Sequence, residues 1–265
     1  MDLELTGKRA IVTGGSRGIG LAIARTLAAE GADVALVARD KSALETARES
    51  VAAQSGRTVL AVSADTGDDQ SVRDMVAQVV AAFGGVDILV NAAARPNTGA
   101  AVGLDAFSDA EFGEQVNIKV LGYLRCVRAV VPHMRAAGWG RVINVSGLAA
   151  RYTGSITGTV RNVAVAALTK NLADELGRDG INVTVVHPGM TVTERLPGLV
   201  AARAASDGVS EDEVERRLAA GVSIGRLVTA EEVASVVAFL ASPKSVAVNG
   251  DTIAVGGGAL GPVYY

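Results

Sequence analysis

Short apolar runs alternate with longer segments of mixed polarity along nearly the whole chain. The runs lie at residues 8–12, 34–37, 59–62, 86–90, 142–145, 183–186 and 252–255. The segments between them are rich in Ala, Glu and Arg and read as helices over 19–29, 41–54, 68–83, 108–137, 158–177 and 230–241. Runs that are apolar on both faces are typical of parallel strands covered by helices on each side. The pattern therefore predicts an α/β fold with a doubly wound parallel sheet of about seven strands.

One segment interrupts this alternation. Residues 191–222 contain Pro197, Gly198 and Gly208 together with the charged stretch SEDEVERRL. Because the segment follows a strand, it begins at the carboxyl edge of the sheet, where open α/β sheets bind their ligands. We expect it to form a lid over a substrate. The alternative is a surface excursion that only packs against the rest of the chain.

Composition narrows the class of protein. A chain of 265 residues with 49% hydrophobic residues can bury a large core, and no linker divides it, so we predict one domain over residues 1–265. The formal charge is −3 without a basic block, which argues against nucleic acid or an anionic membrane as a partner and favours a small molecule. Cys126 is the single cysteine and cannot form an internal disulfide. With no signal-peptide pattern and no apolar run of roughly 18 residues, we expect a cytoplasmic protein.

A glycine-rich turn joins the first predicted strand to the first predicted helix. Residues 13–20 read TGGSRGIG. Glycines let such a turn tighten, so that backbone N–H groups and the helix N-terminus can approach a pyrophosphate. In this strand-turn-helix context the motif indicates dinucleotide binding. The residues that we expect to take part are Gly14, Ser16, Arg17, Gly18, Ile19 and Gly20.

The glycine spacing resembles that of the short-chain dehydrogenase/reductase family, and the resemblance continues over residues 5–258. It includes the turn 91–94 (NAAA), the Pro-Gly loop 188–189, and the final strand with Asn249-Gly250 ahead of it and Gly256-Gly257 after it. The resemblance implies a Rossmann-like fold and a bound nicotinamide dinucleotide. It also implies further cofactor contacts from Asp65, Thr66, Asn91, Ala92, Ala93, Pro188, Gly189, Thr191 and Thr193.

The choice of cofactor depends on the end of the second predicted strand. An acidic residue there accepts the adenosine ribose hydroxyls of NAD and repels a 2′-phosphate. In this chain the position is Ala38, and Arg39 follows it. Arg17 in the glycine turn adds a second cation suited to phosphate. We therefore predict NADP(H); the neighbouring Asp40 leaves NAD open, and Arg39 alone could be a solvated loop charge.

The catalytic positions of the family hold unexpected residues. The resemblance implies a Ser, a Tyr and a Lys four residues after the Tyr, and the aligned positions are Gly147, Gly158 and Asn162. Ser146 lies one place early, and adjacent side chains on a strand face opposite ways, so we expect it to point elsewhere. The family's fourth residue, an Asn in the preceding long helix, corresponds to Lys119. The resemblance therefore predicts an atypical member that lacks the Ser-Tyr-Lys set, with Lys and Asn exchanged.

Another residue must then supply the proton that the family's Tyr gives to a carbonyl oxygen. Asn117 lies near Lys119 but is turned away by about 200° on a helix. Tyr152 precedes the Gly158 position by six residues, yet no Lys lies four residues beyond it. Thr157 and Thr159 are weaker donors, which we expect to cap a helix. Lys119 is predicted to face an interior cleft, where desolvation favours its neutral form.

The two histidines add little to the candidate catalytic residues, and the acidic residues do not indicate a metal site. His187 stands ahead of the Pro-Gly loop, and we expect a structural, hydrogen-bonded role for it. His133 is expected at the surface. No His, Cys, Asp and Glu spacing typical of a metal site is present, so no metal is predicted. The candidate catalytic residues are therefore Lys119, Asn162, Tyr152 and Ser146.

Three functions stay open at this point. The first is an NADP(H)-dependent oxidoreductase acting on a carbonyl or alcohol with a substitute proton donor. The second is a non-redox enzyme, such as a lyase, dehydratase or isomerase, that uses Lys119; the third is a nucleotide-binding pseudoenzyme. Lys119 could also serve only as a clamp for the nicotinamide ribose. The resemblance further implies a homodimer or homotetramer in which helices 108–137 and 158–177 pair with their symmetry mates.

Overall fold

The computed structural model of the protein describes residues 1–95 and 103–261. Its centre is a parallel sheet of seven strands in the order β3-β2-β1-β4-β5-β6-β9, which confirms the predicted doubly wound α/β fold. The order reverses direction at β1, so the first half of the chain extends the sheet one way and the second half the other. The strands are β1 (Arg9–Thr13), β2 (Asp33–Ala38), β3 (Val59–Ser63), β4 (Ile88–Asn91), β5 (Gly140–Val145), β6 (Ile181–Pro188) and β9 (Thr252–Val255).

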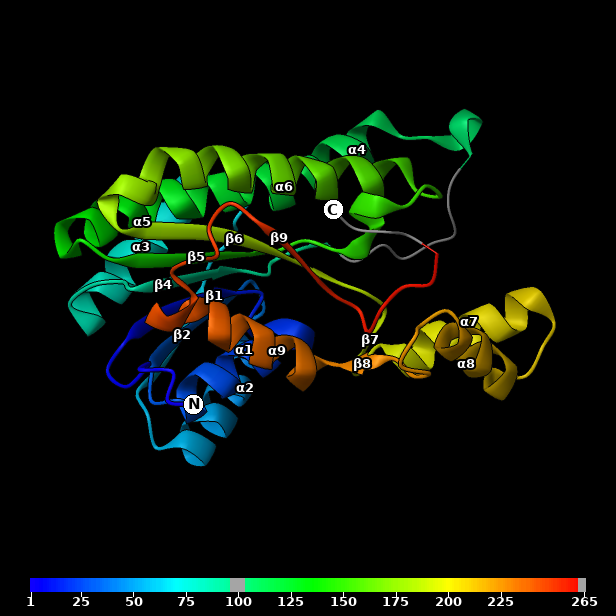
Figure 1. The fold of residues 1–265 in the computed structure, drawn as a ribbon, viewed down its shortest axis with the longest axis horizontal. Coiled ribbons are helices and arrows are strands. Elements are labelled where there is room, and N and C mark those ends of the chain that lie inside the picture. The colour runs from blue at the N-terminus through cyan, green and yellow to red at the C-terminus, as the bar shows by residue number, and fades with distance from the viewer. Residues whose placement is uncertain (96–102, 262–265) are drawn as a thin grey trace.

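Helices cover both faces of this sheet (Figure 1). The strands are buried on each side because alternate residues serve two separate cores: Ala10 and Val12 of β1 belong to one, and Ile11 between them belongs to the other. The first core is covered by α1 (Gly18–Ala29), α2 (Lys41–Ser55) and α9 (Ala230–Ala241). The second is covered by α3 (Asp69–Phe83), α5 (Gly122–Ala137) and α6 (Ile156–Leu176).

The helix predicted over residues 108–137 is confirmed as one helical stretch from Asp109 to Ala137, but its winding changes part-way along. It consists of α4 (Asp109–Val116), a π-helical segment η2 (Asn117–Leu121) and α5. A Cβ at Gly122 would lie 2.9 Å from the main-chain oxygen of Thr66. The helix thus presses directly on the loop after β3, and the wider turn of η2 adjoins this contact. Such π segments are frequent at functional sites, and Lys119 lies in its middle.

The start of α6 also differs from the prediction. Thr157 and Thr159 were expected to cap it, but the helix begins at Ile156, and the Ser155 side chain accepts a hydrogen bond from the Gly158 backbone N–H at 3.0 Å. Ser155 stands in the residue position that an N-cap requires. The hydroxyl of Thr159 instead donates to the main-chain oxygen of Tyr152 at 2.8 Å, which ties the loop before α6 to its first turn.

Residues 191–222 form a helical projection at one end of the molecule (Figure 1). Its two helices pack on each other through a small core of Val200, Ala204 and Val214. The short strands that flank them pair in parallel as a second sheet. The elements are β7 (Thr191–Val192), α7 (Leu196–Asp207), α8 (Glu211–Ala220) and β8 (Val228–Thr229).

The remaining elements are 3-10 turns: η1 (Leu104–Ala106), η3 (Leu148–Arg151), η4 (Gly177–Asp179) and η5 (Pro243–Ser245). Within residues 1–95 and 103–261, no helix has the length and apolar character needed to cross a membrane.

Candidate active site

A cleft of about 1070 Å³ opens at the carboxyl ends of the strands. The structure brings nearly all of the predicted site residues together there, although they come from segments far apart in the sequence. Those that line the cleft are Gly14, Ser16, Arg17, Gly18, Ile19, Gly20, Arg39, Asp65, Thr66, Ala92, Ala93, Lys119, Ser146, Tyr152, Asn162, Pro188, Gly189, Thr191 and Thr193.

Asn91 is the exception among the predicted residues. It is fully buried below the cleft, and its Nδ2 donates to Asn144 Oδ1 at 3.0 Å. Asn144 in turn donates to the Thr169 hydroxyl at 2.9 Å. This chain of polar groups joins β4, β5 and α6 beneath the cleft floor. The side chain of Asn91 therefore supports the site from below rather than lining it.

The glycine turn after β1 fits against the turn after β4 with no room for side chains. A Cβ at Gly14, whose φ is +70°, would lie 2.8 Å from the Ala92 carbonyl oxygen, and a Cβ at Gly20 would lie 2.3 Å from the Gly14 carbonyl oxygen. The Thr13 hydroxyl accepts hydrogen bonds from the backbone N–H groups of Ala92 and Ala93 at 3.1 and 3.2 Å. The close approach leaves the N-terminus of α1 open toward the cleft, which is the arrangement that binds phosphate groups.

Two arginines stand at the rim beside the end of β2. Arg17 Nη2 lies 3.4 Å from Asp40 Oδ2, and Arg39 Nη1 lies 4.0 Å from Asp65 Oδ2. Asp40, the residue that had left the cofactor choice open, caps α2: its Oδ1 accepts from the Ala43 backbone N–H at 3.0 Å. Both arginine side chains are at least half exposed, so these ion pairs are weak and either guanidinium can turn toward a phosphate.

Lys119 is the buried cation of the cleft. Its side chain is 4% exposed, and Nζ donates to the main-chain oxygen of Ser146 at 2.9 Å. Burial, together with the nearby guanidinium of Arg161, lowers the pKa of Lys119 to about 7. The next carbonyl back along the chain, that of Val145, accepts from the Tyr123 hydroxyl at 2.8 Å. Lys119 can therefore exchange a proton near neutral pH.

Arg161 is the residue of the cleft that sequence reasoning missed. It lies on α6 next to Asn162, is 8% exposed and lines the cleft. Its Nη1 donates to Gln115 Oε1 on α4 and, at 3.2 Å, to the main-chain oxygen of Arg95. A long basic residue beside a family catalytic position was a usable signal. Its burial, however, depends on α4 packing across the start of α6, which the local sequence does not encode.

Gly147, Ser146 and Asn162 lie close together at the end of β5. The Ser146 hydroxyl donates to the main-chain oxygen of Asn162 at 3.1 Å. A Cβ at Gly147 would lie 3.1 Å from Asn162 Nδ2, so the amide occupies space that a serine side chain would need. Asn162 Oδ1 is buried and makes no hydrogen bond to the described residues.

His187 has a supporting position behind the cleft. Its Nδ1 accepts a hydrogen bond from the Gly147 backbone N–H at 3.2 Å, so that nitrogen carries no proton. Burial and the neighbouring cations Arg151 and Lys119 lower the pKa of His187 to about 4. The neutral imidazole fixes the chain where β5 ends, which agrees with the expected structural role.

Tyr152 lines the cleft from the loop after η3 and is 36% exposed.

Cys126 is buried on α5, and burial raises the pKa of its thiol to about 12, so it has no thiolate character near neutral pH. Within the described residues, no group of three or more His, Cys, Asp or Glu side chains is placed to hold a metal ion.

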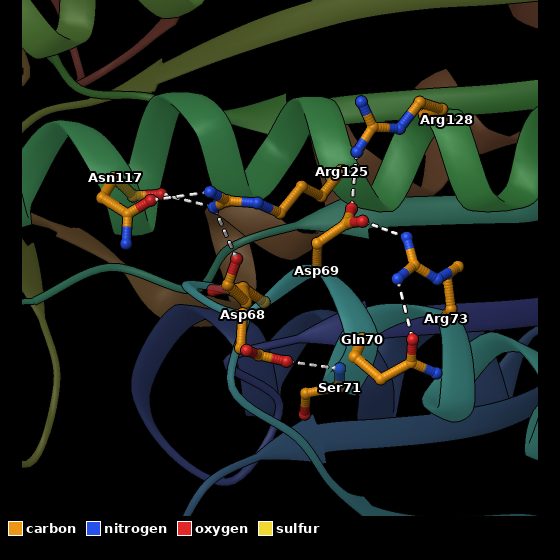
Figure 2. A network of polar contacts seen from close by, with 9 residues as sticks. Asp68, Asp69, Gln70, Ser71, Arg73, Asn117, Arg125 and Arg128 are labelled. Atoms are coloured by element: carbon orange, nitrogen blue, oxygen red, sulfur yellow. Dashed lines mark hydrogen bonds and ion pairs between the residues drawn. The ribbon is translucent and has the colours of Figure 1, made fainter.

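A polar network joins η2 to the loop after β3 (Figure 2). From α5, Arg125 Nη1 donates to the main-chain oxygens of Thr66 and Asn117, both at 3.2 Å, and its Nη2 donates to Asn117 Oδ1 at 2.8 Å. Asn117 Nδ2 donates to the Gly67 main-chain oxygen at 3.2 Å. Asn117 thus faces the loop and not the position of Lys119. Arg125 fixes the first turn of the π segment that carries Lys119.

The comparisons with known proteins agree with this arrangement. A family model described as enoyl-(acyl carrier protein) reductase matches residues 14–259. The chain belongs to the short-chain dehydrogenase/reductase family. Among curated relatives, the short-chain reductase protein NovJ of Streptomyces niveus is 37% identical over 94% of this chain and 92% of its own length. The (2S)-[(R)-hydroxy(phenyl)methyl]succinyl-CoA dehydrogenase subunit BbsC of Thauera aromatica is 35% identical over 97% of this chain and 96% of its own.

Solved structures of the family have the same fold throughout. L-sorbose reductase from Gluconobacter frateurii, in complex with NADPH and L-sorbose, superposes with a TM-score of 0.92 at 32% identity and covers 99% of this chain and 100% of that one. Because the bound cofactor of that enzyme is NADPH, the comparison supports the NADP(H) prediction.

Proposed function

We propose that this protein is an NADP(H)-dependent oxidoreductase that interconverts a carbonyl and an alcohol on a small molecule, with Lys119 in place of the family's tyrosine as the proton donor. The family membership and the NADPH complex of a 32% identical structure support the cofactor and the reaction class. The atypical catalytic set rests on Gly147, Gly158 and Asn162, which offer no hydroxyl and no amine.

The residues of the cleft fit a nicotinamide dinucleotide. The glycine turn leaves the helix N-terminus of α1 open for the pyrophosphate, because a Cβ at Gly14 or Gly20 would strike backbone. Ala38 has no carboxylate to repel a 2′-phosphate, while Arg17 and Arg39 offer two guanidinium groups there. The Pro188–Gly189 loop at the end of β6 would hold the carboxamide. When bound, NADPH supplies a hydride to the carbonyl carbon.

The chain's own residues then handle the proton. Lys119 donates from Nζ to the carbonyl oxygen as negative charge develops on it, and in the alcohol direction the neutral amine takes that proton back. The Ser146 carbonyl oxygen, 2.9 Å from Nζ, holds the amine in position. Burial and, after it, the cation of Arg161 lower the pKa of Lys119, which makes its ammonium a stronger acid. The observation that best supports this role is that Lys119 is buried, lines the cleft and has a pKa near neutrality.

Replacement of Lys119 by Met tests this role. Methionine keeps the length of the buried stem and removes the proton, so we expect NADPH consumption with a panel of ketones to fall by about 10²–10⁴-fold. NADPH affinity, measured by calorimetry, should change by less than about threefold, which is under 0.7 kcal/mol. Lys170→Met is the matched control, because Lys170 is exposed on α6 and pairs with Asp174.

The same variant separates catalysis from ribose binding. If Lys119 only clamps the nicotinamide ribose, Lys119→Met weakens NADPH binding at least tenfold and leaves turnover at saturating cofactor intact. If both activity and affinity survive, the proposed exchange of catalytic positions is wrong.

A second candidate function is a nucleotide-binding subunit without chemistry of its own. Two observations favour it: the family's tyrosine position is Gly158, and one relative of 35% identity is named as a subunit of a dehydrogenase. Such a protein binds NADPH but neither consumes it nor transforms a ketone, alone or with substrate in excess. Non-redox chemistry by Lys119 would instead transform a substrate without change in NADPH absorbance.

We also propose that the helical projection of residues 191–222 covers the substrate. Leu218 of α8 and the loop residues Glu194 and Arg195 line the same cleft as Lys119. The two short strands β7 and β8 flank the projection and pair with each other; β7 follows β6 and β8 leads into α9. A lid in this place shields the reacting groups from water.

A further inference from the structure

The part of the cleft around Lys119 and Arg161, its inner end, carries positive charge without a paired carboxylate in the described part of the chain. Lys119 and Arg161 are both nearly inaccessible to solvent, at 4% and 8% exposed. No carboxylate is among the charged groups that act on Lys119 or Arg161 within the described residues, and the charged group that acts on Lys119 is the Arg161 cation. Buried charges in proteins are usually paired, so this end of the cleft favours an anionic ligand.

The hydrogen bonds of Arg161 locate the unused donors. Its Nη1 is engaged by two neutral acceptors, Gln115 Oε1 and the Arg95 main-chain oxygen. Nε is buried and has no hydrogen-bond partner. In an arginine, Nε and one Nη present two parallel N–H groups along one edge of the guanidinium, and the Nε of that edge has no partner among the described residues. Two such donors match the two oxygens of a carboxylate.

The cofactor phosphates have other binding groups. The glycine turn follows β1, and Arg17 and Arg39 stand at the end of β2. Arg161 lies on α6, which follows β5, and it is held by α4. In the strand order β2-β1-β4-β5, the helix of Arg161 follows a strand two places along the sheet from the strand that precedes the glycine turn. An anion at Arg161 is thus a part of the substrate and not of the cofactor.

We propose that Arg161 binds a carboxylate of the substrate, so that the substrate class is an oxo acid and the corresponding hydroxy acid. Arg161 holds the carboxylate while Lys119, its neighbour in the cleft, faces the carbonyl to be reduced. That the substrate contains a carbonyl group rests on the proposed function. The carboxylate site itself requires only that the acid binds. Gln115 is a positioning residue, because its side-chain oxygen fixes the guanidinium against α4.

Calorimetry on the NADP⁺-loaded protein tests the site without turnover. The probes are pyruvate, acetoacetate and levulinate, each beside its methyl ester, with inorganic phosphate as a further probe. At least one acid is expected to bind tenfold or more tightly than its ester, since the ester keeps the carbonyl and the shape but removes the charge. Arg161→Gln should abolish that preference and leave the affinity for the ester unchanged.

The matched control is Arg95→Gln. Arg95 lines the same cleft, but its guanidinium already pairs with the Glu114 carboxylate, so its replacement should preserve the preference for the acid. Arg161→Lys keeps a positive charge without the planar pair of donors and should retain part of the preference. This second variant serves if the Gln variant melts at a lower temperature and does not stay folded.

Three results overturn the proposal: no acid binds more tightly than its ester, Arg161→Gln keeps the preference, or phosphate binds as tightly as the best acid. These results are distinct from a failure of the proposed function. Acid binding without any NADPH consumption leaves the carboxylate site standing and removes the redox reaction. Equal reduction of acids and esters leaves the redox reaction standing and removes the carboxylate site.

Discussion

Lys119 Nζ donates a 2.9 Å hydrogen bond to the main-chain oxygen of Ser146. This bond joins the π segment η2 to the chain just after β5. The same stretch of chain is held by the Tyr123 hydroxyl at the Val145 oxygen and by His187 at the Gly147 N–H. The amine of Lys119 is consequently fixed in a rigid setting, and its proton affinity is set by burial and by Arg161.

The first prediction concerns the pH dependence of catalysis. Because the pKa of Lys119 is about 7 and its protonated form is the donor, kcat/KM for NADPH-dependent reduction should fall as pH rises above about 7. The alcohol-oxidising direction needs the neutral amine and should rise through the same range. Steady-state rates between pH 5.5 and about 9 measure both limbs. Arg161→Gln removes the neighbouring cation and should move the inflection to higher pH; an unchanged inflection contradicts the assignment to Lys119.

The same residue predicts a pH-dependent stability. In the unfolded chain Lys119 has the ordinary pKa of 10.5, whereas in the folded protein the pKa is about 7. Between these values the unfolded state binds more protons, so the contribution of Lys119 to stability rises with pH, by up to about 1.4 kcal/mol per unit. Urea unfolding of wild type and Lys119→Met at pH 6, 7.5 and 9 measures the difference. A difference that does not change with pH would show that Lys119 titrates normally in the fold.

Cofactor preference should depend on Arg39. Arg39→Asp replaces a guanidinium at the end of β2 by a carboxylate, which repels a 2′-phosphate and can accept the ribose hydroxyls of NADH. NADPH affinity is expected to fall at least tenfold, about 1.4 kcal/mol, and NADH should become the preferred cofactor in calorimetry. Arg25→Asp makes the same charge change on α1 outside the cleft, where Arg25 bonds Ser50, and should leave the preference unaltered. Equal affinity of the wild-type protein for the two cofactors would contradict the prediction.

The Arg125 network should control the position of Lys119 (Figure 2). Arg125→Met removes the hydrogen bonds to the Thr66 oxygen and to Asn117, so we expect about 1–3 kcal/mol of lost stability and a shifted pH inflection for reduction. Arg128→Met is the matched control on the next turn of α5; it breaks only an exposed ion pair to Asp69, worth about 0–1 kcal/mol. Thermal unfolding measures the stability, and the pH profile of reduction measures the shift of the inflection. A loss of stability with an unchanged profile would make Arg125 structural only.

Much of the framework follows from the sequence. Apolar runs on both faces determine the strands, since only a sheet covered on two sides buries them, and β1, β2 and β3 lie within one residue of the predicted limits. Gly20 is decided locally, because a Cβ there would lie 2.3 Å from the Gly14 carbonyl oxygen, whereas Gly14 is required by the turn after β4, which the sheet brings against it. The Ser155 cap was within reach of the sequence but was overlooked.

Other features were decided only by tertiary structure. The π-helical winding of η2 between α4 and α5 adjoins the Thr66–Gly67 loop, which the sheet brings against Gly122 and Arg125. The burial of Arg161 requires Gln115 of α4, 46 residues away in the sequence. The low pKa of Lys119 comes first from its own burial and then from the Arg161 cation, which that same contact between helices holds. Sequence periodicity specifies which face of each element is apolar, but the charge environment of a cleft depends on which elements meet there, and that is set by packing.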